Sequence, residues 1–491
     1  IEEFFTSVLG NRGYAFAEVS GDPEVDQDTS NVKLIFSIQP GKKTYTRKIL
    51  FTGNQVTQDH VLRREMRQFE GAWSSDDSIE AGKIRLERLG YFKEVNVETI
   101  PVPGTDDQID VLYEVEEETT GSLGGNIGYS DFGLMLGFNL QEQNFFGSGN
   151  TVGIGINKNI YSEVYNISFL DPYATKDGVS LGYNLYFRET DYGEFNVANY
   201  LTNSNGLGVQ FGYPISDITR LNFNLTYDKT DIDIGTLPAR EIYDFVAAEG
   251  NLFETLSLGF TWQRVTLNRG LFPTDGSSTS FTLTSTIPGS DINYYRANIR
   301  QRFYQPLSSQ LVFGFQGELG YLDAYGETDE TPFFQNFYAG GPRSLRGFES
   351  NTLGPRSTNA PCYEFNYDDG TCPNLIDTDG DGELDSPYYN PYATNQYSSR
   401  SRYRDPPIGG NVKIEGSLQL IFRLPFIEDQ RSLRSAFFFD FGNVFSDNCK
   451  EYQFNCYKPS IDDLRYSYGV GVTWITGFGP MSLAIAKPTN A

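Results

Sequence analysis

One arginine of this sequence stands among residues that suit burial. In "PRSLRGFES" (342–350), Arg346 is flanked by Leu345, Gly347 and Phe348. A positive charge in a low-dielectric site is strongly destabilising unless a carboxylate pairs with it. We therefore expect Arg346 to meet an acidic residue of another segment, as a structural lock or a functional site. The alternative is an ordinary arginine on a solvated surface.

The segment "SAFFFDFGNVF" (435–445) offers a carboxylate for this arginine. The side chains of a strand alternate between its two faces, so Phe438, Asp440 and Gly442 share one face. We predict that this face lines a cavity and that Asp440 pairs with Arg346. The opposite face carries Phe437, Phe439 and Phe441.

A second candidate partner lies in "NVKIEGSLQLIF" (411–422). Alternation puts Glu415 on the same face as Lys413, Ser417 and Gln419. We expect this face to point inward as well. Glu415 is therefore predicted to share Arg346 with Asp440.

The residue types give little support to an enzyme. The single histidine, His60, lies in a predicted helix of the N-terminal region, far in sequence from the acidic residues of the C-terminal strands. A Ser-His-Asp site among those strands is therefore not available. Paired carboxylates remain open in a chain with 64 acidic residues. We expect that the protein is not an enzyme and requires no cofactor.

One acidic stretch has the spacing of a calcium loop. In "DTDGDGELD" (377–385), Asp377, Asp379 and Asp381 stand at the first, third and fifth positions of such a loop. The glutamate that closes an EF-hand is missing, but a shorter loop that closes with Asp385 fits the pattern. The alternative is a solvated acidic loop tip, and calorimetric titration with calcium distinguishes the two.

Composition favours a mainly β protein in an oxidising compartment. Aromatic residues make up 15% of the chain, and it contains 50 glycines, a profile typical of β-rich folds. A net charge of −26 argues against nucleic acid as a partner. The cysteines form two local pairs without zinc-site spacing, so two disulfides are expected, Cys362 with Cys372 and Cys449 with Cys456.

Residues 42–118 are predicted to form one complete α+β module. A strand that ends at Gly53 precedes a helix that Thr57 can cap. A second helix runs from about Ser75 to Leu89 and stops at Gly90, and two strands follow. Such modules have exposed strand edges that can accept an extended peptide.

Residues 1–41 resemble the second half of this module. "LGYFKEV" (89–95) echoes "RGYAFAEV" (12–19), because in both a helix ends in Gly-Tyr and a strand follows. We interpret 1–41 as a partial module. The alternative is one ordinary α+β domain with a chance similarity. The abrupt start at "IEEFFTSVLG" leads us to expect further modules upstream.

Residues 119–491 are predicted to form a transmembrane antiparallel β-barrel. Strict alternation in segments such as "RLNFNLTYD" (220–228) recurs in about fifteen strands with almost no helix between them. Short connections alternate with long ones, the longest being 323–409, as in outer-membrane barrels. The apolar faces would meet lipid and the polar faces a lumen. A soluble sandwich fits one strand, but it fits the whole series less well. Because such barrels have an even number of strands, we expect a last strand to be missing here.

Two motifs and the module together carry a family resemblance. "LRGF" (345–348) resembles the VRGF-type loop motif of the BamA family, and "FFDFG" (438–442) resembles the wall motif that receives it. The segment 61–73, "VLRREMRQFEGAW", resembles the helical part of a POTRA domain. The resemblance implies a sixteen-stranded barrel whose loop 323–409 enters the lumen. Gln419 stands where relatives often carry a second carboxylate, which is why Glu415 is the substitute partner.

The resemblance also implies a function. The protein would fold and insert β-barrel proteins into the outer membrane of a Gram-negative bacterium, with its modules in the periplasm. It would act at a lateral seam between its first and last strands. Its partners would be unfolded outer-membrane clients, periplasmic lipoprotein subunits and outer-membrane lipids. Rival hypotheses are a passive porin, which leaves the modules unexplained, and a two-partner secretion transporter with one exported client.

The expected first strand, "TGSLGGNIGYS" (120–130), is rich in glycine. Glycine weakens strand packing, so a loosely paired seam there could template a client strand. The alternative is that the glycines relieve crowding at a tilted barrel corner. The candidate seam residues are Gly121, Gly124, Gly125, Asn126 and Gly128.

Overall fold

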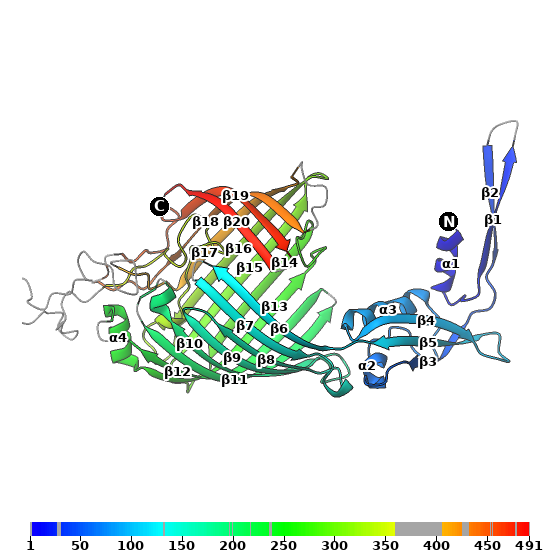
Figure 1. Ribbon diagram of the computed structural model, residues 1–491, viewed down its shortest axis with the longest axis horizontal. Helices are drawn as coiled ribbons and strands as arrows, with labels where there is room; N and C mark the ends of the chain where they lie inside the picture. Colours follow the sequence, from blue (N-terminus) through cyan, green and yellow to red (C-terminus); the bar gives the residue numbers. More distant parts are fainter. Residues whose placement is uncertain are drawn as a thin grey trace, which may run out of the picture. The chain divides into compact units, whose positions relative to one another are not determined.

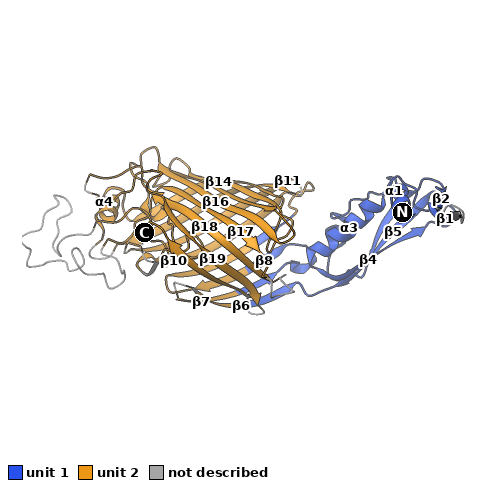
Figure 2. Cartoon of the chain, turned by 90° about the horizontal axis from the view of Figure 1, so that it is seen from above, with its two compact units in different colours: residues 1–124, 139–153, 169–172 blue, residues 125–138, 154–168, 173–491 orange. Residues whose placement is uncertain are grey.

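The computed structural model contains three β-sheets, of two, three and fifteen strands. The chain divides into two compact units, coloured separately in Figure 2. Unit 1 holds residues 1–124 together with 139–153 and 169–172 of the large sheet, and unit 2 holds the rest. The structure describes residues 2–26, 31–130, 133–195, 197–198, 200–216, 218–234, 238–358, 405–424, 432–451, 453, 455–476 and 479–490.

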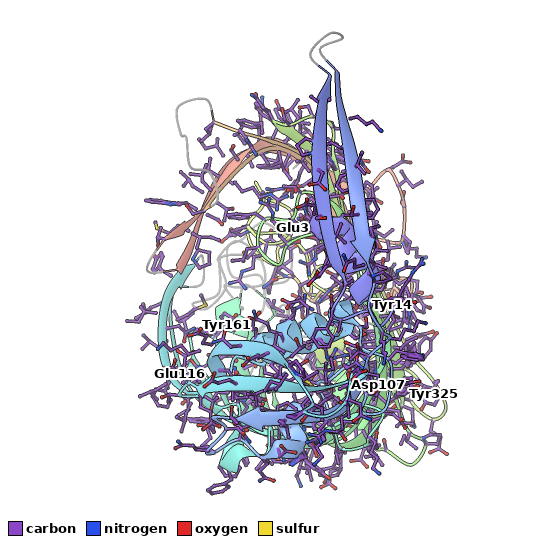
Figure 3. All side chains as sticks on the ribbon, turned by 90° about the vertical axis from the view of Figure 1, so that its right-hand side faces the viewer. Glu3, Tyr14, Asp107, Glu116, Tyr161 and Tyr325 are labelled. Atoms are coloured by element: carbon purple, nitrogen blue, oxygen red, sulfur yellow. A yellow bond between two sulfur atoms is a disulfide. The ribbon has the colours of Figure 1, made fainter. Side chains whose placement is uncertain are left out.

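The N-terminal residues form a helix and a two-stranded ribbon. Helix α1 (Glu2–Gly10) precedes β1 (Glu18–Asp26) and β2 (Asn31–Gln39), which pair antiparallel and lie side by side in Figure 3. This helix–strand–strand order is the order expected of a partial module. The assignment of 1–41 as such a module stays a prediction.

A three-stranded sheet with two helices forms the complete module. Its strands lie in the order β3-β5-β4, with β3 parallel to β5 and β4 antiparallel to it. Helix α3 begins after Ser75, whose hydroxyl accepts the N–H of Ser78, and it ends at Gly90 in the left-handed conformation, as predicted. The elements are β3 (Tyr45–Thr52), α2 (Asp59–Arg63), α3 (Asp76–Leu89), β4 (Phe92–Pro101) and β5 (Gln108–Glu117).

The prediction that Thr57 caps the first helix was wrong. Helix α2 is short, and its N-cap residue is Gln58, which makes no side-chain capping bond. The hydroxyl of Thr57 instead accepts a hydrogen bond from Nδ2 of Asn144 at 2.8 Å. A contact with the turn between β7 and β8 therefore competes with the local cap.

The carboxylate of Glu117 organises the loop that follows β3. It accepts the backbone N–H groups of Gln55 (3.0 Å), Val56 (2.9 Å) and Thr57 (2.6 Å). Partial burial acts to raise the pKa of Glu117, but hydrogen bonds from Thr57, Val56 and Gln55 outweigh it and hold the pKa below its usual value. The charged carboxylate thus fixes a loop that contacts the large sheet's turn within unit 1.

The large sheet runs in sequence order from β6 to β20, and the expected count of fifteen strands is confirmed. In the part of the chain that the structure describes, β6 and β20 are the two edges (Figure 1). The predicted sixteenth strand would lie beyond this chain and stays a prediction. The strands are β6 (Gly121–Ser130), β7 (Gly133–Glu142), β8 (Thr151–Lys158), β9 (Ser162–Asp171), β10 (Ser180–Asp191), β11 (Leu201–Ser216), β12 (Thr219–Asp233), β13 (Leu252–Val265), β14 (Gly276–Thr286), β15 (Tyr294–Pro306), β16 (Leu311–Ala324), β17 (Val412–Phe422), β18 (Leu433–Phe445), β19 (Arg465–Thr476) and β20 (Gly479–Pro488).

The up-and-down topology gives the sheet two different ends. We call the end where β6 begins the turn end, because β11–β12, β15–β16 and β19–β20 are joined there by short connections. The opposite end, the loop end, carries α4 (Arg240–Glu249) and the long segment between β16 and β17. Short 3-10 helices lie at η1 (Phe145–Gly147), η2 (Tyr192–Phe195) and η3 (Phe333–Gln335). Among the described residues, no helix has the length and apolar character to cross a membrane.

The two faces of the sheet differ as the alternation predicted. On β18, Phe437 and Phe439 are exposed while Phe438 and Asp440 are buried. Apolar side chains of β12 and β13 are exposed in the same way as Phe437; Phe223 and Leu258 are examples. The faces with the exposed apolar side chains are therefore not the core of a two-layer sandwich.

The loop end has a hydrophobic core of its own. Phe245 of α4 packs in one cluster with Phe333, Phe337 and Leu345 of the segment after β16. The carboxylate of Glu241 accepts the backbone N–H of Thr358. The long segment is thus folded against the sheet through the residues that the structure describes.

One of the two expected disulfides is present. Cys449 and Cys456 are bonded, with their Cα atoms 5.8 Å apart. The other expected pair, Cys362 and Cys372, lies outside the described residues. So do the candidate calcium ligands Asp377, Asp379, Asp381 and Asp385.

We predict that Glu117→Ala speeds amide hydrogen exchange in residues 54–57 about tenfold, because three N–H groups lose a charged acceptor. Hydrogen-exchange mass spectrometry of the whole chain measures this. The control is Glu116→Ala, which removes an exposed neighbour that pairs with Lys93. Since the folded pKa of Glu117 is depressed, the extra protection is present above its usual pKa and is lost as the pH falls through the folded pKa. Equal exchange in both variants contradicts the role assigned to Glu117.

We also predict that reduction of Cys449–Cys456 loosens the connection between β18 and β19 and leaves the sheet intact, because the bond closes only a short local loop. Limited proteolysis with and without reductant tests this. New cleavage confined to residues 446–464 is the expected result, and general digestion of the strands would contradict it.

Candidate functional site: a buried arginine and two sheet edges

Arg346 reaches the wall of the sheet and pairs with Asp440, as the sequence predicted. Its Nε and Nη2 atoms each donate to a carboxylate oxygen of Asp440 at 2.7 Å. The backbone N–H of Arg346 donates to the same carboxylate at 3.2 Å. The side chain of Asp440 is 0% exposed and that of Arg346 is 18% exposed. This bidentate geometry is the strong form of an ion pair.

Two neighbours of the pair come from the predicted motifs. The guanidinium of Arg346 lies over the ring of Phe438, 3.4 Å from its centroid, in a cation–π contact. Leu345 is fully buried in the hydrophobic cluster of the loop end, and Phe348 packs against that cluster. A Cβ placed on Gly442 would lie 3.2 Å from Cδ1 of Leu345 and 2.4 Å from the carbonyl oxygen of Ile414, so glycine leaves room for both.

The prediction that Glu415 shares Arg346 was wrong. Nη2 of Arg346 donates instead to Oγ of Ser417 at 3.0 Å. The strand register gives the reason, because Ser417 lies opposite Asp440, whereas Glu415 lies opposite Gly442. Glu415 is therefore displaced along β17 from the arginine.

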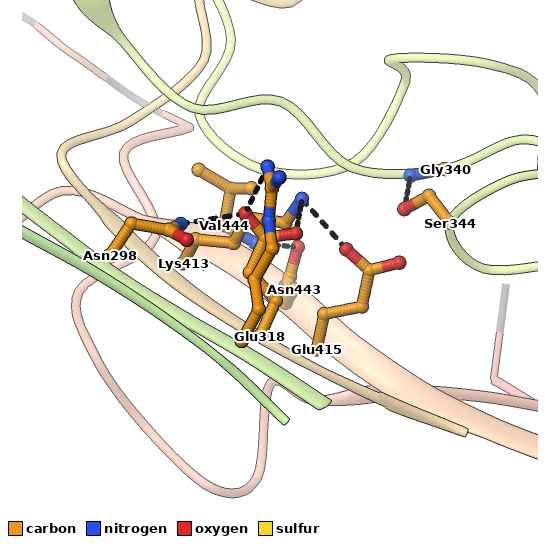
Figure 4. A network of polar contacts seen from close by, with 9 residues as sticks. Asn298, Glu318, Gly340, Ser344, Lys413, Glu415, Asn443 and Val444 are labelled. Atoms are coloured by element: carbon orange, nitrogen blue, oxygen red, sulfur yellow. Dashed lines mark hydrogen bonds and ion pairs between the residues drawn. The ribbon is translucent and has the colours of Figure 1, made fainter. Parts of the chain in front are cut away.

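Glu415 belongs to a separate polar network on the same wall, drawn in Figure 4. Lys413 pairs with Glu415 at 2.8 Å and with Glu318 of β16 at 3.4 Å. Nδ2 of Asn298 donates to Glu318 at 2.7 Å. Glu415 thus forms its ion pair with Lys413, whereas Arg346 binds Asp440 and Ser417.

Gly347 places the loop against the last two strands. Its φ of +93° lies in the left-handed region that favours glycine. A Cβ built on it would lie 3.1 Å from Cβ of Ala486 on β20 and 3.5 Å from Cβ of Ser467 on β19. Two consecutive residues of the loop motif therefore lie against four strands: Arg346 against β17 and β18, and Gly347 against β19 and β20.

The sequence pattern alone does not identify two residues of this site. Ser417 was placed on the correct face, and its position opposite Asp440 follows only from the register. Gly469 of β19 was not singled out. A Cβ there would lie 2.0 Å from the carbonyl oxygen of Ile485 and 2.7 Å from Cζ of Phe438, so glycine makes room for the ring that supports Arg346.

The candidate seam residues lie on the edge strand β6. A Cβ on Gly124 would lie 2.6 Å from Oδ1 of Asn139, and one on Gly128 would lie 3.1 Å from Cε of Met135. A Cβ on Gly121 would lie 2.9 Å from Oε2 of Glu142. Gly125 differs, because a Cβ there meets only a carbonyl oxygen at 4.0 Å. Asn126 is exposed and projects toward Gly137, whose built Cβ would overlap its Oδ1.

The other edge, β20, is also exposed. Met481, Leu483 and Ile485 are between 61% and 79% exposed. An exposed strand edge such as that of β6 can accept a further strand through main-chain hydrogen bonds.

Comparison with known proteins fits this architecture. The Omp85 superfamily domain matches residues 144–491, and a POTRA domain, described as a surface antigen variable number repeat, matches residues 44–118. The crystal structure of BamA from Haemophilus ducreyi lacking POTRA domains 1–3 superposes with a TM-score of 0.77 at 31% identity, covering 100% of this chain and 89% of that chain. The chain belongs to the BamA family of the Omp85 superfamily. The predicted localisation, the outer membrane with POTRA modules in the periplasm, is confirmed by this membership.

Two further comparisons limit what can be carried over from the family to this chain. The chain is 32% identical to the outer membrane protein assembly factor BamA of Neisseria meningitidis over 98% of its own length and 58% of that protein. It therefore spans little more than half of this relative. The structure of CdiB from Acinetobacter baumannii, at 12% identity and a TM-score of 0.53, covers 100% of this chain and 76% of that chain, and it shares the fold alone.

We predict that Arg346→Ala destabilises the folded loop by about 3–5 kcal/mol, because Asp440 is left charged and buried. Limited proteolysis of the segment between β16 and β17 under increasing urea measures this. Arg343→Ala is the matched control, since that arginine is exposed and only three residues away.

The ion pair between Arg346 and Asp440 also predicts the stability of two further variants. Ser417→Ala should cost about 1 kcal/mol, the loss of one hydrogen bond. The double variant Arg346→Ala/Asp440→Ala should be more stable than Arg346→Ala alone, because no unpaired charge remains. Equal stability of Arg346→Ala and Arg343→Ala would show that the arginine is not held as described.

Proposed function

We propose that this protein folds β-barrel proteins and inserts them into the outer membrane at a seam between its first and last strands. The observation that carries the proposal is the glycine-rich first strand β6, which lies at an edge of a sheet of the BamA family. An extended client segment can add to an exposed edge through main-chain hydrogen bonds. The curated relative of Neisseria meningitidis is itself named an outer membrane protein assembly factor, which supports the proposal.

The free energy for insertion comes from the client. Burial of its apolar side chains in lipid is worth roughly 25 cal/mol per Å². The chain therefore needs to supply only a template and an opening in the sheet. We propose that it performs no covalent catalysis. Its only histidine, His60, lies on the short helix α2 of the module.

The proposed partners are those that the family resemblance implies. Unfolded outer-membrane proteins would add to the seam, and outer-membrane lipids would surround the exposed apolar faces. Periplasmic lipoprotein subunits would bind the modules, whose sheet has β3 and β4 as its edges. The rival function, export of a single protein, predicts one client in place of many.

Depletion of the full-length protein in its host tests the proposal. We expect the levels of many unrelated outer-membrane barrels to fall together, as measured by quantitative proteomics of outer-membrane fractions. Re-expression of the protein is the control and should restore them. Loss of one secreted protein, with other barrels unchanged, would contradict assembly and support the transporter.

A further inference from the structure

A cavity at the loop end lies between the inner face of the large sheet and the segment that follows β16. Strands β10, β11, β12, β13 and β15 provide one side of it, and Asn336 and Tyr338 belong to the other. Its volume is about 410 Å³, which is in the range of small-molecule sites. The cavity is on the inner face because Asp228, which lines it, alternates along β12 with the exposed Leu225 and Tyr227.

Two arginines and one aspartate are the charged residues among the described residues that line this cavity. The carboxylate of Asp228 accepts the hydroxyl of Tyr186 on one oxygen and that of Thr230 on the other, at 2.5 Å for Thr230. The guanidinium of Arg188 lies 5.4 Å from the ring centroid of Tyr186. No described carboxylate pairs with Arg188 or Arg296. The cavity therefore has an excess of positive charge in a chain with a net charge of −26, and it suits an anion.

Each side of the cavity contributes a residue with a buried polar atom that has no hydrogen-bond partner in the described part of the chain. Nε of Arg296 is such a donor, and Oδ1 of Asn336 is such an acceptor. Nδ2 of Asn336 donates to the carbonyl oxygen of Ile408 at 3.0 Å, and Arg296 lies 4.2 Å from the ring centroid of Phe337. An unsatisfied buried polar atom is destabilising, so a ligand with both acceptors and donors would gain by binding between these two residues.

Hydroxyl groups dominate the rest of the lining. Serine, threonine and tyrosine make up more than half of the described residues that line the cavity. Gly206 makes room for one of them, because a Cβ there would lie 2.6 Å from Cζ of Tyr186. Hydroxyl groups both donate and accept hydrogen bonds, so this lining matches a molecule that has several hydroxyl groups of its own.

We propose that this cavity binds a monosaccharide that carries a phosphate group. The arginines would hold the phosphate, because a guanidinium matches its oxygens in geometry and charge. Asn336 and the hydroxyl groups of the wall would bind the sugar. A lipid headgroup would lie beside the outer, apolar face of the sheet, so the occupant of this inner cavity is a soluble sugar phosphate. The inference goes beyond the proposed function, since neither β6 nor β20 lines the cavity.

Isothermal titration calorimetry of the purified full chain in detergent tests the site. The probes are glucose 6-phosphate and glucose 1-phosphate, and glucose and inorganic phosphate are the matched fragments. We expect at least one of the two sugar phosphates to bind about tenfold more tightly than either fragment. Glucose lacks the charge-assisted contacts with the arginines, and inorganic phosphate lacks the contacts with the hydroxyl groups.

Two variants separate the two halves of the site. Arg188→Gln should weaken the binding of the sugar phosphate about tenfold, and the fold should tolerate it because Arg188 is exposed. Tyr294→Phe removes one hydroxyl from the lining and should weaken the sugar phosphate about threefold, with no effect on inorganic phosphate. The control Arg302→Gln removes an exposed arginine from the inner face of β15, outside the described lining, and should leave binding unchanged.

Four outcomes would overturn the inference. If neither sugar phosphate binds to the unaltered chain, the site does not exist. If inorganic phosphate binds as tightly as the sugar phosphates, the cavity does not recognise a sugar. Equal loss in Arg188→Gln and Arg302→Gln indicates attraction by net charge alone. Binding that neither Arg188→Gln nor Tyr294→Phe weakens places the ligand elsewhere. Because the assay measures ligand binding alone, none of these outcomes affects the depletion experiment on assembly.

Discussion

The buried ion pair between Arg346 and Asp440 is the constraint on which the loop end depends. A carboxylate that is 0% exposed is tolerated only while a cation satisfies it. Here three N–H donors of Arg346, one of them from its backbone, converge on Asp440, and Phe438 supports the guanidinium from one face. The long segment between β16 and β17 is therefore fixed to the wall at a defined point, and its apolar residues can build a core around that point.

The same contact joins the loop to the edge of the sheet. Gly347 lies against Ala486 of β20, the strand that ends the described sheet. The ion pair thus fixes the loop to the inner face of the sheet, while the first strand, β6, lies at an edge of the described sheet. The proposed opening of a seam at β6 requires such a fixed point, because the remaining strands must keep their places while the seam is open.

Period-two alternation made most of the fold predictable, because each face of a membrane sheet meets a different solvent. It placed Phe438 and Asp440 on the inner face and gave the count of strands. It could not give the register between strands, and register decides that Ser417 rather than Glu415 lies opposite Asp440. Thr57 shows the same limit. It was expected to cap α2, but its hydroxyl instead accepts a hydrogen bond from Asn144, which is far away in sequence. Gly347 and Gly469 matter through close approaches that only the folded chain creates.

Hydrogen exchange in β19 and β20 tests the central claim most directly. If the Arg346–Asp440 pair holds the last strands through the loop, Arg346→Ala should speed exchange in residues 467–488 while residues of β11–β13 stay as protected as before. Arg343→Ala should leave both regions unchanged. Unaltered exchange in β19 and β20 after loss of Arg346, with the loop itself released, would show that the pair fixes the loop alone and does not support the edge of the sheet.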